Sequence, residues 1–97
     1  MVYMKIVDTP DGFLLAACDR ELLGRTFSGN DFVLDVKEDF YKGDLVSIND
    51  FAEKLPKAFV ANLVGVNVVS KAVELGEILE SSVIYIEGVP HAQLAKI

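Results

Sequence analysis

The sequence predicts an α+β fold in which two or three short helices pack on one face of a mostly antiparallel sheet. Three observations support this class: an apolar β-hairpin opens the chain, stretches with helical spacing follow, and strand-like segments around a turn close it. Strands and helices that are grouped in this way are typical of α+β domains. A chain of 97 residues, 52% of them hydrophobic, has room for a single domain over residues 1–97 with one core.

The opening hairpin is predicted from strand propensity and a turn signal. β-branched and aromatic residues run through 2–7, and the turn at 9–12 contains Pro10, which presets φ, and Gly12, which tolerates positive φ. Residues 13–18 then return as the second strand. Because that strand is apolar throughout, we expect it to be central and covered on both faces.

The next segment is predicted to form a helical turn, a loop and a strand. Asp19 can cap a single helical turn that Gly24 ends. Residues 28–31 are expected to form a loop. Alternation of apolar and polar residues over 32–37 predicts a half-buried strand, and residues 45–46 predict a short extension of the sheet.

A helix is predicted to begin after Ser47, which has capping-box spacing to an acidic residue three positions later. Its apolar face runs at helical spacing from Ile48 to Leu55. Pro56 interrupts this helix and suits the first position of another one. Residues 58–64 therefore fit either a new helix or a buried strand.

The last third of the chain is predicted to contain one more helix and two strands. Asn67 is expected to cap the helix, and Gly76 suits its left-handed C-terminal position. Residues 83–86 predict a strand, 88–91 a turn, and 92–97 a final strand that pairs back.

Charge and hydropathy exclude some classes of function. The net charge is −6, and the nine Lys and Arg residues are scattered singly, so a broad basic surface for nucleic acid is absent. No window of about 20 apolar residues is present to span a membrane, and the first residues do not resemble a secretory signal. The chain has a single cysteine, Cys18. We therefore expect a soluble, cytoplasmic protein.

Four segments, taken in order, resemble one protein family. They are residues 18–24, 40–43, 61–65 and 88–93, with the sequences CDRELLG, FYKG, ANLVG and GVPHAQ. Over nearly the whole chain they are similar to the archaeal family known as domain of unknown function four-two-four. The resemblance implies a stand-alone archaeal protein of about this length without an established reaction, and the broad archaeal occurrence suggests a link to RNA or translation. The pair at 66–67 departs from the acidic and hydroxylated residues expected there.

Cys18, Asp19 and His91 form the candidate catalytic set. A cysteine before a helix start and near Arg20 and Arg25 can become a nucleophile, because helix N-termini and cations lower a thiol's pKa. His91 is the single histidine and can serve as a general base. Each member also has a structural interpretation: a small residue that ends a buried strand, a helix cap, and a turn residue bonded to a local carbonyl.

The candidate binding residues are polar and aromatic side chains at predicted turns: Tyr41, Lys42, Asn62, Asn67, His91 and Gln93. Tyr41 and Lys42 can stack on a base and contact a phosphate; alternatively, Phe40 and Tyr41 end a strand and fill the core. The loop from Asn62 to Asn67 precedes a helix N-terminus that can hold an anion; alternatively, the two asparagines are a buried hydrogen-bonding residue and a helix cap.

The sequence therefore predicts a non-catalytic binding module that contacts a protein or ribonucleoprotein partner, with RNA or translation as the associated process. The alternative is a small enzyme that uses Cys18, Asp19 and His91. A homodimer formed through an edge strand is a third hypothesis, which the apolar content favours. One histidine and one cysteine cannot build a tetrahedral zinc site alone, so we expect no metal site, and we expect no cofactor.

Overall fold

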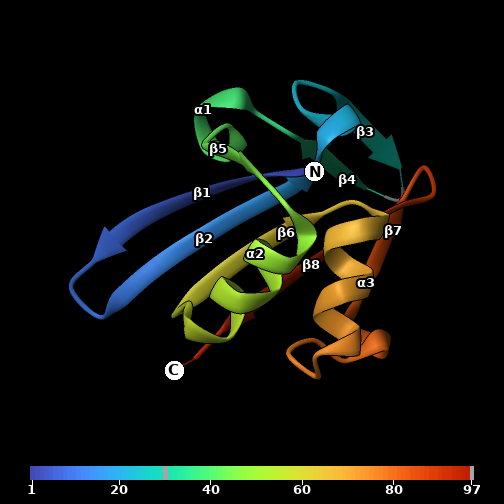
Figure 1. The fold of residues 1–97 in the computed structure, drawn as a ribbon. Coiled ribbons are helices and arrows are strands. Elements are labelled where there is room, and N and C mark those ends of the chain that lie inside the picture. Colours follow the sequence, from blue (N-terminus) through green and yellow to red (C-terminus); the bar gives the residue numbers. More distant parts are fainter. Residues whose placement is uncertain (30, 97) are drawn as a thin grey trace.

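The computed structural model describes residues 1–29 and 31–96 and contains a large and a small sheet (Figure 1). The large sheet has six strands in the order β5-β1-β2-β6-β8-β7, and the small sheet pairs β3 with β4. The large sheet consists of β1 (Val2–Thr9), β2 (Gly12–Asp19), β5 (Asp44–Val46), β6 (Val60–Val64), β7 (Ile84–Ile86) and β8 (Val89–Ala95). The remaining elements are β3 (Thr26–Gly29), β4 (Phe32–Asp35), α1 (Glu38–Tyr41), α2 (Ile48–Lys54), α3 (Val66–Glu74) and 3₁₀ turns at Arg20–Leu22, Leu55–Lys57 and Glu80–Ser82.

The large sheet is antiparallel except for one central pair. β1 and β2 form the predicted hairpin, in which Val2 lies opposite Asp19. β6 runs parallel to β2 with Cys18 beside Val64, whereas β8 is antiparallel to β6 and β7 is antiparallel to β8. The predicted α+β class with a mostly antiparallel sheet is therefore confirmed.

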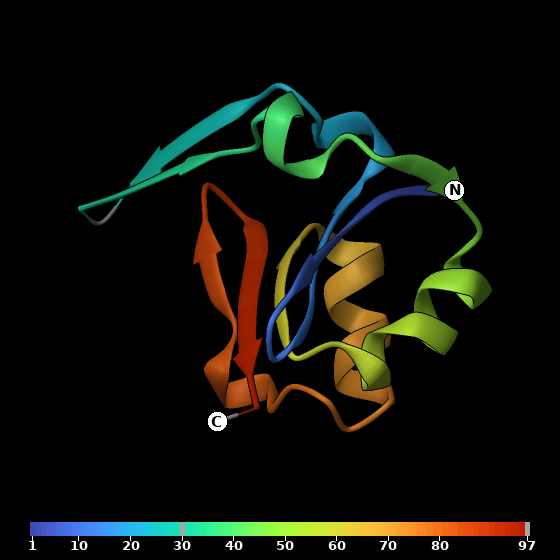
Figure 2. The same ribbon diagram turned by 90° about the vertical axis from the view of Figure 1, so that its left-hand side faces the viewer.

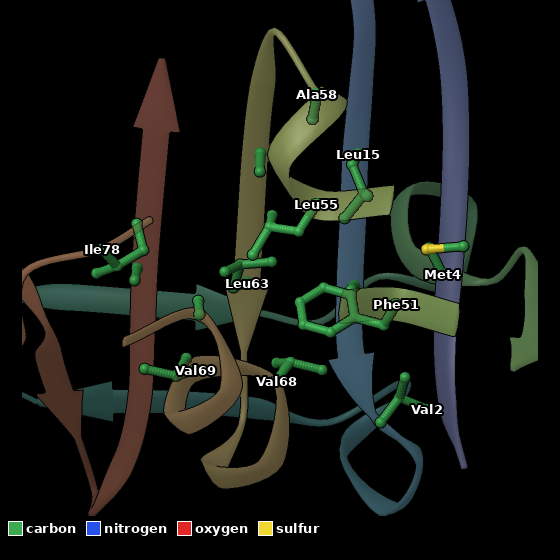
Figure 3. Close-up of a cluster of buried hydrophobic side chains, with 14 residues drawn as sticks. Val2, Met4, Leu15, Phe51, Leu55, Ala58, Leu63, Val68, Val69 and Ile78 are labelled. Carbon is green, nitrogen blue, oxygen red and sulfur yellow. The ribbon is translucent and has the colours of Figure 1, made fainter. Parts of the chain in front are cut away.

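Helices α2 and α3 cover one face of the large sheet, and the main core lies beneath them. Figure 3 shows apolar side chains of the two helices packed on Leu15 and Leu63 of the central strands. Phe51 of α2 and Val68 of α3 are fully buried there, as the helical spacing of apolar residues predicts. The hydroxyl oxygen of Ser47 accepts a hydrogen bond from the N–H of Asp50 at 3.1 Å, so the predicted cap of α2 is confirmed.

The opposite face of the large sheet is covered at one end only. There the β3–β4 hairpin and α1 pack on a second cluster of buried residues that contains Cys18, Phe27 and Tyr41. Figure 2 shows the hairpin reaching outward over β7 and β8. The N–H of Ser28 donates to the Glu87 carboxylate at 2.9 Å, which ties the hairpin to the turn between β7 and β8.

Two predictions in the first half of the chain differ from the structure. Phe40 and Tyr41 belong to a one-turn helix and not to a strand end, because the N–H of Tyr41 donates to the carbonyl of Lys37 at 3.0 Å. Ser28 and Gly29 belong to β3 and not to a loop. That strand pairs with β4 and buries Phe27 against the sheet, a long-range contact that a local sequence window does not contain.

In the second half, residues 60–64 form strand β6, which decides between the two forms that the sequence left open. His91 lies inside strand β8 and not in a turn, because the chain reverses at Glu87 and Gly88, which both have positive φ. The predicted loop also included Asn30 and the last strand included Ile97, and both lie outside the described residues.

Asp19 and Gly65 join the parallel strand pair to the start of α3. The buried Asp19 carboxylate accepts the N–H of Asn67 at 2.9 Å and the N–H of Val68 at 3.1 Å. Asp19 makes no side-chain cap bond to the 3₁₀ turn at Arg20–Leu22, and Asn67 is not the cap of α3. The predicted roles of both residues are therefore corrected: the strand end at Asp19 caps a helix 48 residues later in the chain.

Gly65 is the residue that this arrangement requires. Its φ of 117° and ψ of 155° lie in a region that only glycine occupies readily, and a Cβ atom there would overlap the Asp19 carboxyl group. We expect Gly65→Ala to lower the free energy of unfolding by more than about 2 kcal/mol.

Gly76→Ala is the matched control, because Gly76 also has a positive φ, of 78°, but faces open space. It should cost only about 1 kcal/mol. Urea unfolding of both variants measures the difference. Equal losses would show that contact with Asp19 adds nothing to the backbone strain at Gly65.

Candidate functional site

The sheet register brings three of the sequence motifs into one row. Cys18 on β2 lies beside Val64 on β6, and Val64 lies opposite His91 on β8. All three side chains belong to the face of the sheet that α2 and α3 leave uncovered, because residues paired across neighbouring strands share a face. The motifs at the ends of these strands therefore converge, although most of their side chains are buried.

Cys18 is buried completely beneath the β3–β4 hairpin. Burial raises the pKa of its thiol to about 12, and the nearby carboxylates of Asp19 and Glu21 act in the same direction. His91 lies two strands away, which corresponds to roughly 10 Å between the backbones. The geometry thus holds Cys18 as a protonated thiol, separated from the histidine by Val64.

Asp19 is occupied by its two hydrogen bonds to the start of α3. Burial raises the pKa of its carboxyl group above the ordinary value of 3.8, and the N–H groups of Asn67 and Val68 partly offset that effect. Its two oxygens therefore hold the start of α3, and the carboxylate does not point toward His91.

The candidate binding residues separate into three places. Tyr41 is buried in the second cluster, where burial raises the pKa of its hydroxyl to about 12, and Lys42 is exposed next to it. Asn67 is exposed at the start of α3, on the side of the sheet that the helices cover. These three side chains do not lie on the surface that the other candidates share.

Asn62, His91 and Gln93 do come together on the uncovered face. The side-chain amide of Gln93 donates to Asn62 Oδ1 at 2.9 Å, across a register in which these residues are directly opposite. His91 Nδ1 lies 3.0 Å from the carbonyl oxygen of Leu63. Because a carbonyl oxygen only accepts, Nδ1 carries the proton in the neutral ring, and Nε2 then carries a lone pair.

His91 and Gln93 form the floor of a cleft of about 420 Å³ between the β3–β4 hairpin and the outer strands. We call it the hairpin cleft. Phe32, Val33 and Leu34 line it from the hairpin side. Ser82, Ile84 and Ile86 line it from the β7 side, and Ala92 completes the lining. The walls are thus mainly apolar and the floor is polar, as in ligand pockets where a few polar groups fix the orientation of the ligand.

The sequence did not single out the apolar walls of this cleft. Phe32 is 52% exposed and Val33 is 73% exposed, although alternation predicted only a half-buried strand for this segment. The available signal was the pair of adjacent apolar residues Phe32 and Val33, because one residue of any such pair in a one-sided strand has to face away from the core.

Two kinds of site are absent from residues 1–29 and 31–96. No group of three His, Cys, Asp or Glu side chains there lies close enough together to hold a metal ion. No helix in the same ranges has the length and apolar character needed to cross a membrane.

The fold and the cleft define a small α+β protein with one helix-covered sheet face and one face half covered by a hairpin. The chain belongs to the family described as "Protein of unknown function (DUF424)", whose model matches residues 7–97. It is also similar to an uncharacterised conserved protein from Methanopyrus kandleri, whose crystal structure superimposes with a TM-score of 0.80 at 29% identity, covering 99% of this chain and 94% of the other. No curated protein matches the chain significantly. The predicted family is confirmed, and neither description assigns a function.

We expect Asp19→Asn to destabilise the protein by about 1–3 kcal/mol, because an amide can accept only one of the two N–H groups of α3. The loss should depend on pH. The pKa of Asp19 is raised in the folded state, so its protonation adds stability that is fully present below about pH 3.8 and is lost as pH rises through the folded pKa. Unfolding curves from pH 3 to 7 should therefore show the largest difference at the acid end. A difference that grows toward pH 7 would contradict the raised pKa.

Cys18 should be unreactive in the folded protein, because its pKa of about 12 and its burial leave little accessible thiolate. We expect alkylation by iodoacetamide at pH 8 to be at least on the order of 100-fold slower in the folded chain than in urea. Mass spectrometry over time measures both rates. Rapid labelling of the folded protein would return Cys18 to the list of candidate nucleophiles.

Proposed function

We propose that this protein is a non-catalytic binding module that takes an apolar side chain of a protein partner into the hairpin cleft. The observation that carries the proposal is the hairpin itself, which holds Phe32 exposed beside the polar floor formed by His91 and Gln93. Exposed apolar side chains that face a cleft with a few polar groups are typical of recognition sites. We place this binding in the cytoplasm.

Charge favours a protein partner over direct contact with RNA. Among the described residues, no Lys or Arg lines the hairpin cleft, and the residue that follows β7 is the acidic Glu87. Phosphate groups are bound by cations, and a carboxylate repels them. A ribonucleoprotein partner would on this basis be contacted through its protein component.

The geometry favours binding over catalysis at this place. Within residues 1–29 and 31–96, His91 is the single titratable side chain that lines the hairpin cleft. The other two members of the candidate catalytic set, Cys18 and Asp19, are buried below the hairpin or bound to α3. A lone imidazole with its Nδ1 proton held by Leu63 can orient a ligand by accepting a hydrogen bond at Nε2.

The proposal is tested by selecting displayed random 12-residue peptides on the wild-type protein and measuring the selected peptides on two variants. Phe32→Ser removes an apolar wall of the cleft. Because the ring is 52% exposed, we expect the fold to persist. Binding should weaken by at least about tenfold, as for an apolar anchor at an interface.

Val7→Ser is the matched control, since Val7 is 45% exposed on β1 and does not line the cleft. Fluorescence anisotropy of the labelled peptides should give the same affinity for this variant as for the wild type. Peptides that bind Phe32→Ser as tightly as the wild type would remove the hairpin cleft from consideration.

A further inference from the structure

We propose that the partner binds as an added β-strand along the free edge of β7, and that the bound segment is an extended peptide with alternating apolar side chains and basic residues. β7 is the outermost strand of the large sheet on the side of the hairpin cleft. Strand addition supplies backbone hydrogen bonds, and flanking pockets then select alternate side chains. The inference rests on the proposed function, because one of the two pockets is the hairpin cleft.

The backbone of β7 presents its free hydrogen-bonding groups at Tyr85. The carbonyl oxygen of Pro90 accepts the N–H of Gly65 at 2.9 Å, so the main-chain groups of Pro90 point toward β6. Tyr85 lies opposite Pro90 in the β7–β8 register. In an antiparallel pair, residues opposite each other either exchange both hydrogen bonds or turn away from each other. The N–H and C=O of Tyr85 therefore point outward from the edge of the sheet.

Apolar pockets flank this edge on both faces of the sheet. On the uncovered face, Ile84 and Ile86 line the hairpin cleft. On the helix side, Val83 and Tyr85 line a second groove of about 300 Å³ between β7 and α3, which we call the helix-side groove. Successive side chains of a strand point to opposite faces, so an added strand would place alternate side chains in the hairpin cleft and in the helix-side groove.

Charge around the edge predicts the flanking residues of the peptide. Between Ala72 and Ala95 the chain contains four glutamates and no Lys or Arg. Glu80 lines the helix-side groove, and Glu87 follows the last residue of β7, so an acidic side chain lies near each end of the edge. Lys or Arg residues that flank the apolar core of a peptide would therefore be favoured by complementary charge.

The same charges disfavour a second copy of this chain as the occupant. Pairing two β7 edges would bring two acidic borders together, between molecules that each carry a net charge of −6. β7 also has only three residues, so two paired copies share a ladder of about 10 Å, which is short for a stable interface. A peptide brings no second acidic border, and it adds contacts in both pockets to the same short ladder.

The test compares two substitutions at Tyr85, which is 58% exposed. Tyr85→Pro and Tyr85→Thr both remove the ring, but only proline removes the outward N–H. Proline is tolerated on edge strands where that N–H faces solvent. Peptides selected from the random 12-residue library on the wild-type protein should bind Tyr85→Pro at least about tenfold more weakly than Tyr85→Thr. The selected sequences should show apolar residues at every second position and an excess of Lys and Arg.

An N-methyl scan of one selected peptide provides a second measurement that does not depend on the fold of a variant. Methylation should weaken binding at the peptide position whose N–H faces the carbonyl of Tyr85, and leave the two neighbouring positions, whose N–H groups point away from β7, unaffected. Peptides that lose affinity for Phe32→Ser, yet bind Tyr85→Pro and Tyr85→Thr equally, would overturn strand addition while the proposed function stands. Peptides indifferent to all three variants would overturn both. Dimers of the wild type in sedimentation that Tyr85→Pro dissociates would identify a second copy as the occupant and overturn the peptide.

Discussion

The buried carboxylate of Asp19 is the interaction on which the rest of this structure depends. It ends β2, and its two oxygens accept the N–H groups of Asn67 and Val68 in the first turn of α3, so it joins a strand end to a helix start. Gly65 makes that approach possible, because any larger residue would occupy the space of the carboxyl group. Removing a charge from water is costly, and the raised pKa of Asp19 reflects that cost. The position of α3 on the sheet, and with it the main core, follows from this contact.

The unequal cover of the two sheet faces produces the surface described above. α2 and α3 seal one face with a continuous core, whereas the hairpin and α1 seal only one end of the other face. Phe32 lies beyond the buried pair of Phe27 and Leu34 and is left exposed, and Val33 is exposed because it points to the opposite face of β4 from Leu34. The apolar walls of the cleft are thus a consequence of a hairpin longer than the cluster of buried residues that it covers. Binding would remove those side chains from water.

Sequence reasoning predicted the elements whose signals are local and missed the contacts that span the chain. The first hairpin and α2 carry their own turn, cap and periodicity, so they were predicted correctly. The role of Asp19 was not predicted, since its partners lie 48 and 49 residues away and a capping residue has the same signature for either helix. His91 was assigned to a turn because Gly88 and Pro90 resemble turn residues, whereas Pro90 lies within β8. Of the candidate binding residues, Asn62, His91 and Gln93 lie close together because β6 pairs with β8 in the sheet. The register of that pair cannot be predicted from the sequence of one strand alone.

Pro90 fixes the pairing register of β8 with its two neighbours, β6 and β7. It has no N–H to offer Gly65, and the carbonyl of Gly65 is used instead by the N–H of Val69 in the first turn of α3, at 3.0 Å. Helix and sheet therefore never compete for that oxygen. If β8 slid by one residue, an ordinary amide would face that oxygen and the proline ring would face β7, where a ladder bond would be lost. Pro90 thus sets which main-chain groups of β8 pair with β6 and which pair with β7, and through that pairing which groups of β7 lie at the free edge of the sheet.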